Sequence, residues 1–354
     1  MIIDDLLRMM LDKKASDLHL KAGRNPILRI HGELIPQTDL PELSNDDIRG
    51  LVGQMVTDEH KVRFDRDREL DLAYTLQGSA RFRVNVLMQR EKIGSVIRVI
   101  PWKIPTLEEM KFPPILADLA LKPRGLVLVT GPTGSGKSTT LAAMLNHINV
   151  NEACHILTVE DPIEFVHQDK KSVFNQRELG TDTLSFSASL KHALRQDPDV
   201  ILVGEMRDPE TIQLAITAAE TGHMVFSTLH TTGAAQTIDR VIDVFSPEQQ
   251  PQIRTQLAGL LEGVVSQTLL AKSDGSGRAC AMEIMICTPA IRNLIREGKI
   301  YQIPSTMQTG VSMGMQTLDS ALKALYEKRI VSFEEAASKA TNPEAFRAAV
   351  EKGK

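Results

Sequence analysis

The chain contains the stretch Gly131-Pro132-Thr133-Gly134-Ser135-Gly136-Lys137-Ser138-Thr139, which fits the pattern G-x-x-x-x-G-K-[ST]. An apolar run at 126–129 precedes it, and a segment compatible with a helix follows from Thr139 to His147. Glycines allow successive backbone N–H groups to turn toward phosphate oxygens, and the helix adds its N-terminal dipole. Lys137 is expected to reach the β- and γ-phosphates, and Ser138 to hold Mg²⁺. The stretch 131–139 therefore predicts a binding site for ATP or another nucleoside triphosphate.

Length and charge restrict the class of protein. The 354 residues are enough for two domains, and a net charge of −4 gives no electrostatic reason to expect nucleic acid as the main partner. None of the three cysteines, Cys154, Cys280 and Cys287, belongs to a C-x-x-C pair. We therefore expect reduced thiols in the cytoplasm, without a zinc site or a disulfide framework.

The chain starts with acidic residues where a signal peptide would be basic, and no uninterrupted apolar stretch reaches the roughly 18 residues that span a bilayer. If the protein works at a membrane, a partner is expected to hold it there.

Three regions follow one another along the chain. Residues 1–100 are expected to form a small α+β domain, with a helix at 2–11 and strands at 27–30, 70–74, 81–86 and 95–100. The proline-rich segment 101–114 is expected to be an interdomain linker and hinge. From 115 to 354 the alternation of strands and helices predicts a parallel sheet, with a hairpin turn at 273–277 and helices at the C-terminus.

Three further strands of this sheet are expected at 156–159, 200–203 and 224–228. Glu160, Glu205 and His230 follow their ends. Ligands of open parallel sheets lie beyond the carboxyl ends of the strands, so these side chains are expected to converge on the nucleotide.

Each of these side chains has a functional and a structural interpretation. Glu205 stands where a Walker B acid is expected and is assigned to Mg²⁺; the alternative is a solvent-facing loop carboxylate. Glu160 is expected to orient the attacking water or accept its proton; the alternative is a helix cap or a surface acid. His230 is the better candidate for a γ-phosphate sensor than His223, which either faces a neighbouring domain or subunit or is structural.

Further positive charge is needed on the transferring phosphoryl group. Arg81 and Arg83 lie on one face of a strand by alternation, and Arg98 lies on its expected partner strand. These arginines either reach the nucleotide or simply pair with carboxylates at the surface.

In combination, the motifs resemble those of the secretion ATPase superfamily over nearly the whole chain. They are the phosphate loop and the segments 15–20, 81–85, 158–164, 197–208, 221–223 and 229–231. Within that superfamily, the segment 290–298 is similar to the C-terminal motif of the type IV pilus retraction motors. The extension motors typically carry a tetracysteine zinc module, which this chain lacks.

The resemblance implies an α/β protein with a RecA-like P-loop core and a smaller PAS-like N-terminal domain, assembled as a homohexamer. It implies that Glu160 is the catalytic base, that Glu205 is the Walker B acid and that His230 lies in the His box. Arg83 and Arg98 would approach phosphate from the N-terminal domain. The cytoplasmic ring would be peripheral to the inner membrane, turn a platform protein there and withdraw pilin subunits.

Three other functions remain open from the sequence. They are a RecA-like nucleic-acid translocase, a secretion or pilus-extension ATPase of the same superfamily, and a nucleotide-gated scaffold that barely turns over. The small aromatic content of 4% and the acidic net charge weigh against the translocase.

Overall fold

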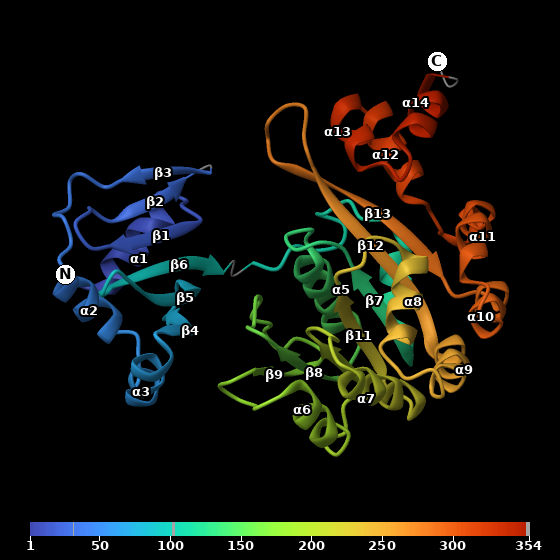
Figure 1. Cartoon of the computed structure of the whole chain (residues 1–354), viewed down its shortest axis with the longest axis horizontal. Helices are drawn as coiled ribbons and strands as arrows, with labels where there is room; N and C mark the ends of the chain where they lie inside the picture. Colours follow the sequence, from blue (N-terminus) through green and yellow to red (C-terminus); the bar gives the residue numbers. More distant parts are fainter. Residues whose placement is uncertain (31, 101–102, 352–354) are drawn as a thin grey trace. The chain divides into compact units, whose positions relative to one another are not determined.

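The computed structural model describes residues 1–30, 32–100 and 103–351. The chain divides into two compact units, Met1–Lys103 and Ile104–Lys354, which are described separately (Figure 1). The linker expected at 101–114 begins with residues 101–102, which lie outside the described residues. From Ile104 onward the chain belongs to the second unit, where Leu107 is buried and Phe112 packs against the same core.

The first unit is built on a six-stranded antiparallel sheet with the order β3-β2-β1-β6-β5-β4. Its strands are β1 (Asp17–Lys21), β2 (Ile27–Ile30), β3 (Glu33–Pro36), β4 (Glu69–Leu76), β5 (Ala80–Gln89) and β6 (Lys92–Ile100), and its helices are α1 (Ile3–Asp12), α2 (Asn45–Gly53) and α3 (Asp58–Asp67). The apolar positions of α1 recur every three or four residues, so one stripe of this helix is buried.

The helix at 2–11 and the four strands expected in this unit are confirmed, whereas β1, β3, α2 and α3 were not anticipated. In the β5–β6 register Arg83 lies directly opposite Arg98, and Arg81 shares the less buried face of β5 with Arg83. The common face expected for Arg81 and Arg83 is therefore confirmed.

The second unit contains a seven-stranded sheet with the order β13-β12-β7-β11-β10-β8-β9. The strands are β7 (Gly125–Thr130), β8 (His155–Glu160), β9 (Val173–Glu178), β10 (Val200–Val203), β11 (Met224–Leu229), β12 (Leu261–Ala271) and β13 (Arg278–Ile286). All neighbouring strands are parallel except β12 and β13, which form an antiparallel hairpin around the turn expected at 273–277. The parallel sheet expected for 115–354 is confirmed.

Helices cover both faces of this sheet. They are α4 (Ile115–Ala120), α5 (Lys137–Asn151), α6 (Phe186–Ala193), α7 (Pro209–Glu220), α8 (Ala234–Asp243), α9 (Gln250–Leu260) and α10 (Pro289–Arg296). Leu126 and Leu128 of β7 pack in the core formed with α6 to α10, while Val127 and Val129 pack in the core formed with α4 and α5. A strand buried on both faces must be apolar throughout, which explains the continuous run at 126–129.

The C-terminal part adds η1 (Ile300–Gln302), α11 (Ile303–Thr309), η2 (Val311–Met313), α12 (Leu318–Glu327), α13 (Phe333–Lys339) and α14 (Pro343–Glu351). The last three helices share a small core with the distal part of the β12–β13 hairpin. The side chain of Asn342 accepts hydrogen bonds from the backbone N–H groups of Glu344 and Ala345, so it caps the N-terminus of α14.

Candidate active site

The phosphate loop connects β7, at the centre of the sheet, to the N-terminus of α5. Gly131, Gly134 and Gly136 have positive φ angles of 141°, 78° and 93°, a conformation that side chains disfavour. A Cβ atom on Gly131 would lie 2.3 Å from the carbonyl oxygen of Gln267 and 2.6 Å from the hydroxyl of Ser135. The pattern therefore requires glycine at 131 for steric reasons as well as for the turn.

Two polar groups of the loop have the properties of phosphate ligands. The ammonium of Lys137 donates to the carbonyl oxygens of Gly131 at 2.8 Å and Pro132 at 3.2 Å, so it is folded back over the loop. Burial lowers the pKa of Lys137, and the charges of Glu205 and Glu164 oppose this effect. The hydroxyl of Ser135 is buried without a hydrogen-bond partner among the described residues. A bound phosphate would satisfy both groups, so the loop fits this ligand.

A glutamine that the sequence analysis did not single out holds the loop in place. Gln267 of β12 is buried, its amide donates to the backbone carbonyl of Ser135 at 2.7 Å, and its carbonyl oxygen accepts from the hydroxyl of Thr140 at 2.9 Å. One side chain thus joins the loop to the first turn of α5. Its partners lie 132 and 127 residues away along the chain, so no local pattern could have revealed them.

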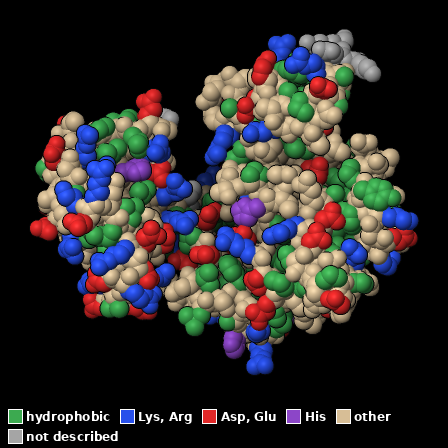
Figure 2. All heavy atoms as spheres, viewed as in Figure 1, with side chains coloured by type: hydrophobic (Ala, Val, Ile, Leu, Met, Phe, Trp, Pro, Cys, Tyr) green, Lys and Arg blue, Asp and Glu red, His purple; other side chains and the backbone are tan. Residues whose placement is uncertain are grey.

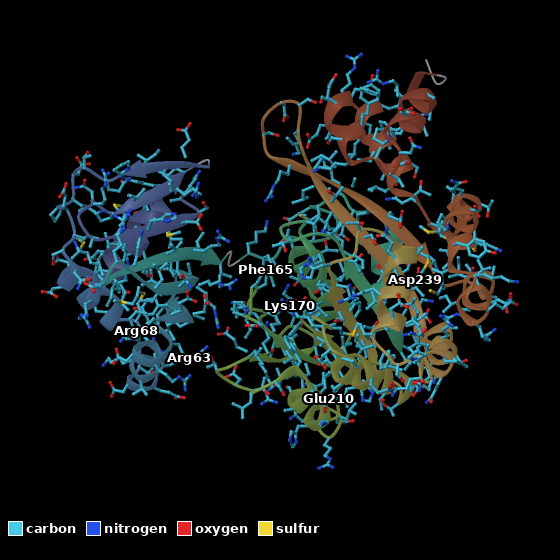
Figure 3. The ribbon with its side chains drawn as sticks, in the orientation of Figure 1. Arg63, Arg68, Phe165, Lys170, Glu210 and Asp239 are labelled. Atoms are coloured by element: carbon cyan, nitrogen blue, oxygen red, sulfur yellow. The ribbon has the colours of Figure 1, made fainter. Side chains whose placement is uncertain are left out.

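The loop borders a cavity of about 780 Å³ within the second unit. The expected site residues that line it are Thr133, Gly134, Gly136, Lys137, Ser138, Thr139, Glu160, Glu205 and His230. Phe165, labelled in Figure 3, and Phe186 contribute apolar wall to the same cavity. The strands β8, β10 and β11 are neighbours and run parallel. The expected convergence of Glu160, Glu205 and His230 is therefore confirmed.

Glu205 is held by two cationic or potentially cationic side chains. One of its carboxylate oxygens lies 2.6 Å from Nε of Arg207 and 3.1 Å from Nε2 of His230. Burial alone would raise the pKa of Glu205, but the hydrogen bond and charge of Arg207 and the charges of His230 and Lys137 hold it below its ordinary value. Glu205 is therefore an ionised acceptor suited to organising a cation. Arg207 was not anticipated as a site residue.

Glu160 has different surroundings. Its Oε1 accepts hydrogen bonds from the hydroxyl of Thr158 at 2.7 Å and from the amide of Gln176 at 3.1 Å. Burial raises the pKa of Glu160 to about 7, these hydrogen bonds and one from the backbone of Glu164 oppose the rise, and the negative charge of Glu164 adds to it. A carboxylate with this pKa can take up a proton at neutral pH.

His223 lies at the other end of β11 from His230. Its Nδ1 is 2.8 Å from the carbonyl oxygen of Ala218 in the last turn of α7 and 3.1 Å from the hydroxyl of Thr221. A carbonyl oxygen only accepts, so the ring donates to it and caps the helix. This contact favours the structural interpretation of His223.

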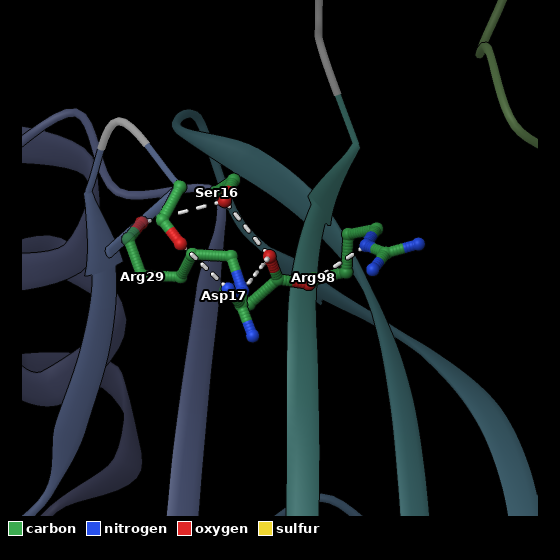
Figure 4. Close-up of polar contacts among 5 residues, drawn as sticks. Ser16, Asp17, Arg29 and Arg98 are labelled. Carbon is green, nitrogen blue, oxygen red and sulfur yellow. Dashed lines mark hydrogen bonds and ion pairs between the residues drawn. The ribbon is translucent and has the colours of Figure 1, made fainter. Parts of the chain in front are cut away.

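Two of the candidate arginines of the first unit, Arg83 and Arg98, lie close to carboxylates of their own sheet. Nε of Arg98 lies 2.7 Å from Asp17, which is 3% exposed and also accepts from the hydroxyl of Ser16 (Figure 4). Nε of Arg83 lies 3.8 Å from Asp71. The surface-pairing alternative thus holds for Arg83 and Arg98 in this structure, and a contact of either residue or of Arg81 with phosphate stays a prediction.

A metal would need few protein ligands here. Within residues 1–30, 32–100 and 103–351, no group of three or more His, Cys, Asp or Glu side chains could hold a metal ion. Magnesium in phosphate sites is bound by one or two protein groups together with phosphate oxygens and water. Ser138 and Glu205 line the same cavity and could supply these protein groups.

In the described part of the chain no helix has the length and apolarity to cross a bilayer.

Comparisons with known proteins agree with this geometry. The family model described as "Type II/IV secretion system protein" matches residues 1–338. The chain is 53% identical to the type IV pilus retraction ATPase PilT of Pseudomonas aeruginosa over 98% of its length and 100% of that protein. It is 52% identical to a twitching motility protein of Neisseria gonorrhoeae, over 91% of this chain and 86% of that protein.

Two solved structures also resemble this chain over nearly its whole length. The crystal structure of the pilus retraction motor PilT with bound ADP superposes with a TM-score of 0.92 at 43% identity, covering 98% of each chain. The ATPase DotB of Legionella pneumophila superposes with a TM-score of 0.80 at 28% identity, covering 94% of each chain. Because this family model and these relatives match nearly the whole chain, the chain belongs to the type II/IV secretion system protein family.

Proposed function

We propose that this chain is a Mg²⁺-dependent ATPase that powers the retraction of type IV pili and thereby twitching motility. One observation carries the proposal: a phosphate loop and two carboxylates with opposite environments line one cavity, in a chain that is 53% identical from end to end to a protein named for this activity. The rest of the proposal concerns what each of these residues does.

The loop residues 131–139 would bind the triphosphate through their backbone N–H groups and the N-terminus of α5. Lys137 would exchange the carbonyl oxygens that it now contacts for phosphate oxygens and neutralise charge that develops during transfer. Magnesium, held by Ser138 and Glu205, would supply further neutralisation of the phosphate charge. His230, bonded to Glu205, would report the state of the γ-phosphate to the rest of β11.

Glu160 would act on the water that attacks the γ-phosphate. It would orient this water through a hydrogen bond and accept its proton at the carboxylate. The pKa of about 7 keeps a large ionised fraction at neutral pH.

The assembly that we propose is a homohexamer in the cytoplasm, attached to the inner membrane through a pilus platform protein, with pilin subunits as the indirect cargo. Residues 1–100 would be the N-terminal PAS-like domain, 101–114 would contain the hinge, and 115–354 would be the motor domain. Closure about the hinge would convert nucleotide binding into rotation of rigid bodies. Arg81, Arg83 and Arg98 are the candidates to sense phosphate from the N-terminal domain.

A nucleic-acid motor would share this core fold, so the distribution of charge on the protein surface helps to distinguish the two functions. Figure 2 shows Lys and Arg side chains interspersed with Asp and Glu on the face in view, without a continuous basic stripe. An electrostatic track for nucleic acid would require such a stripe. We expect single- and double-stranded DNA to leave ATP hydrolysis unchanged, and strong stimulation by either would favour the translocase.

The test of the proposal is a pair of measurements on Lys137→Ala. The purified variant should lose ATP hydrolysis by about three orders of magnitude, because the charge on the phosphoryl group is no longer balanced. In cells that lack their own retraction ATPase, the native chain should restore twitching motility and the variant should not. Hydrolysis retained by the variant would contradict the site, while a hydrolysing native chain that fails to restore motility would contradict the cellular role only.

A further inference from the structure

Two side chains that carry no role in the reaction as described so far converge on one oxygen of Glu160. Thr158 lies on β8 two residues before Glu160, and Gln176 lies on the edge strand β9. Thr158 and Gln176 are directly paired in the parallel β8–β9 register. Residues two apart on a strand share a face, so this register brings both donors to the same side of the sheet as the carboxylate.

The hydrogen bonds of Gln176 fix the orientation of its amide. Its Oε1 accepts from the backbone N–H of His167 at 2.7 Å, and its Nε2 donates to the carbonyl oxygen of Phe165 at 2.9 Å. A backbone N–H can only donate and a carbonyl oxygen can only accept, so the amide cannot be flipped without losing both bonds. The second N–H of the amide is therefore available for Glu160, at 3.1 Å from its Oε1.

The segment that anchors Gln176 is itself held against β9. The ring of His167 stacks on Phe174 with centroids 4.3 Å apart and an interplanar angle of 4°. Burial lowers the pKa of His167 to about 4, so the ring is neutral at neutral pH and packs as an apolar group. The backbone groups that hold the amide of Gln176 thus belong to a segment that is itself packed against β9.

Both donors favour the ionised form of Glu160. An N–H or O–H aimed at a carboxylate oxygen stabilises the negative charge, whereas burial destabilises it. The donors oppose burial, which is the largest effect on this group. We propose that Gln176 and Thr158 are positioning residues, which keep the carboxylate of Glu160 ionised and in one orientation at the wall of the nucleotide cavity. This inference rests on the proposed role of Glu160 as the base.

Other titratable and charged groups line the same cavity or pair with the end of β8. They are Asp161 and Glu164 on the β8–β9 connection, Glu178 on β9, Glu205 and Arg207 after β10, His230 after β11, and Lys137 on α5. Among these, the charge of Glu164 raises the pKa of Glu160. The substitutions that test the proposal leave all of these groups in place.

The experiment is the pH dependence of single-turnover ATP hydrolysis by the full chain. For the native protein we expect the rate to rise with pH through about 7, as Glu160 loses its proton. Thr158→Val and Gln176→Leu each remove one donor to the charged form, so each should move this acidic limb upward by about one pH unit. The rate of each variant should therefore fall most at pH 6 to 7 and recover in part near pH 9.

Two controls separate positioning from general damage. Asn175→Leu also replaces an amide side chain with leucine, one position earlier on β9, where the amide contacts His155, so the limb should stay in place. Thr158→Ser keeps the hydroxyl and should keep the position of the limb. Neither Thr158 nor Gln176 lines the cavity, so the affinity for a fluorescent ADP analogue should change by less than about twofold in all variants.

Each result decides the matter. A limb that moves in Thr158→Val and stays in Thr158→Ser supports the proposal, even if Gln176→Leu fails to fold. A rate that falls by one factor at every pH in Thr158→Val, with the limb in place, overturns it. If Glu160→Gln hydrolyses ATP normally, the proposed function of Glu160 fails; if that variant is inactive but the limb does not move, only the present inference fails.

Discussion

The carboxyl ends of β8 and β10 offer a comparison within one site. The two strands are parallel neighbours in which Val159 pairs with Val203. Strand β8 ends in Glu160, and β10 is followed at once by Gly204 and Glu205. Glu160 accepts hydrogen bonds from the neutral side chains of Thr158 and Gln176, and burial raises its pKa to about 7. In contrast, Arg207 and His230 hold the pKa of Glu205 below its ordinary value. The same residue type at the same edge of the sheet thus has opposite protonation behaviour.

The glycine before Glu205 separates the two carboxylates. A Cβ atom on Gly204 would lie 3.0 Å from the carbonyl oxygen of Val159 and 3.2 Å from Cα of Glu160. The backbone at 204 therefore packs closely against the end of β8, and the carboxylate is displaced by one residue along β10. Pairs of acids whose environments separate their pKa values commonly divide the roles of base and cation ligand between them.

Glu160→Gln is expected to have the largest effect on ATP hydrolysis. An amide cannot accept a proton, so single-turnover hydrolysis should fall by about two to three orders of magnitude. ATP affinity should change little, because the phosphate loop is untouched. Stopped-flow hydrolysis and equilibrium binding of a fluorescent ATP analogue measure the two quantities. Hydrolysis within a factor of about five of the native rate would remove Glu160 from the reaction.

Glu205→Gln should weaken the binding of Mg²⁺ and should leave the transfer of a proton to Glu160 intact. The loss of one anionic ligand should raise the Mg²⁺ concentration for half-maximal hydrolysis by about tenfold or more. Excess Mg²⁺ should restore part of the rate, which it cannot do for Glu160→Gln. The measurement is a Mg²⁺ titration at a fixed, saturating ATP concentration. An unchanged midpoint with a reduced maximum would mean that the two carboxylates do not divide the roles as proposed.

The comparison also shows which parts of the site a sequence can reveal. Glu160, Glu205 and His230 were located because each follows an apolar run that is buried on both faces of the sheet, and such runs are visible in one dimension. Their convergence followed from the rule that ligands lie at the carboxyl ends of parallel strands.

The partners of these residues could not be located in the same way. Strand β9 reads Val-Phe-Asn-Gln-Arg-Glu and lies at an edge, so it lacks the apolar run and its Gln176 went unnoticed. Gln267 matters because of a contact with Ser135 that depends on tertiary packing. Arg207 matters because of a contact with Glu205, two residues away in the loop after β10, whose conformation no periodic pattern defines. In the first unit the shared face of Arg81 and Arg83 was predictable from alternation, whereas the acidic partners of Arg83 and Arg98 were not.

Arg207→Gln should have a smaller effect on hydrolysis than Glu160→Gln or Glu205→Gln. The side chain of Arg207 is 77% exposed, and exposed ion pairs are worth at most about 1 kcal/mol, which is about fivefold in affinity. Arg207 binds the carboxylate that Mg²⁺ requires, so its removal should lower the Mg²⁺ concentration for half-maximal hydrolysis by up to this factor. Arg207→Lys keeps the charge and should keep the midpoint closer to the native value. If Arg207→Gln instead raises the Mg²⁺ concentration for half-maximal hydrolysis, the guanidinium supports metal binding and does not compete with it. The difference between Glu205 and Glu160 would then depend on Arg207 in the metal-bound state as well.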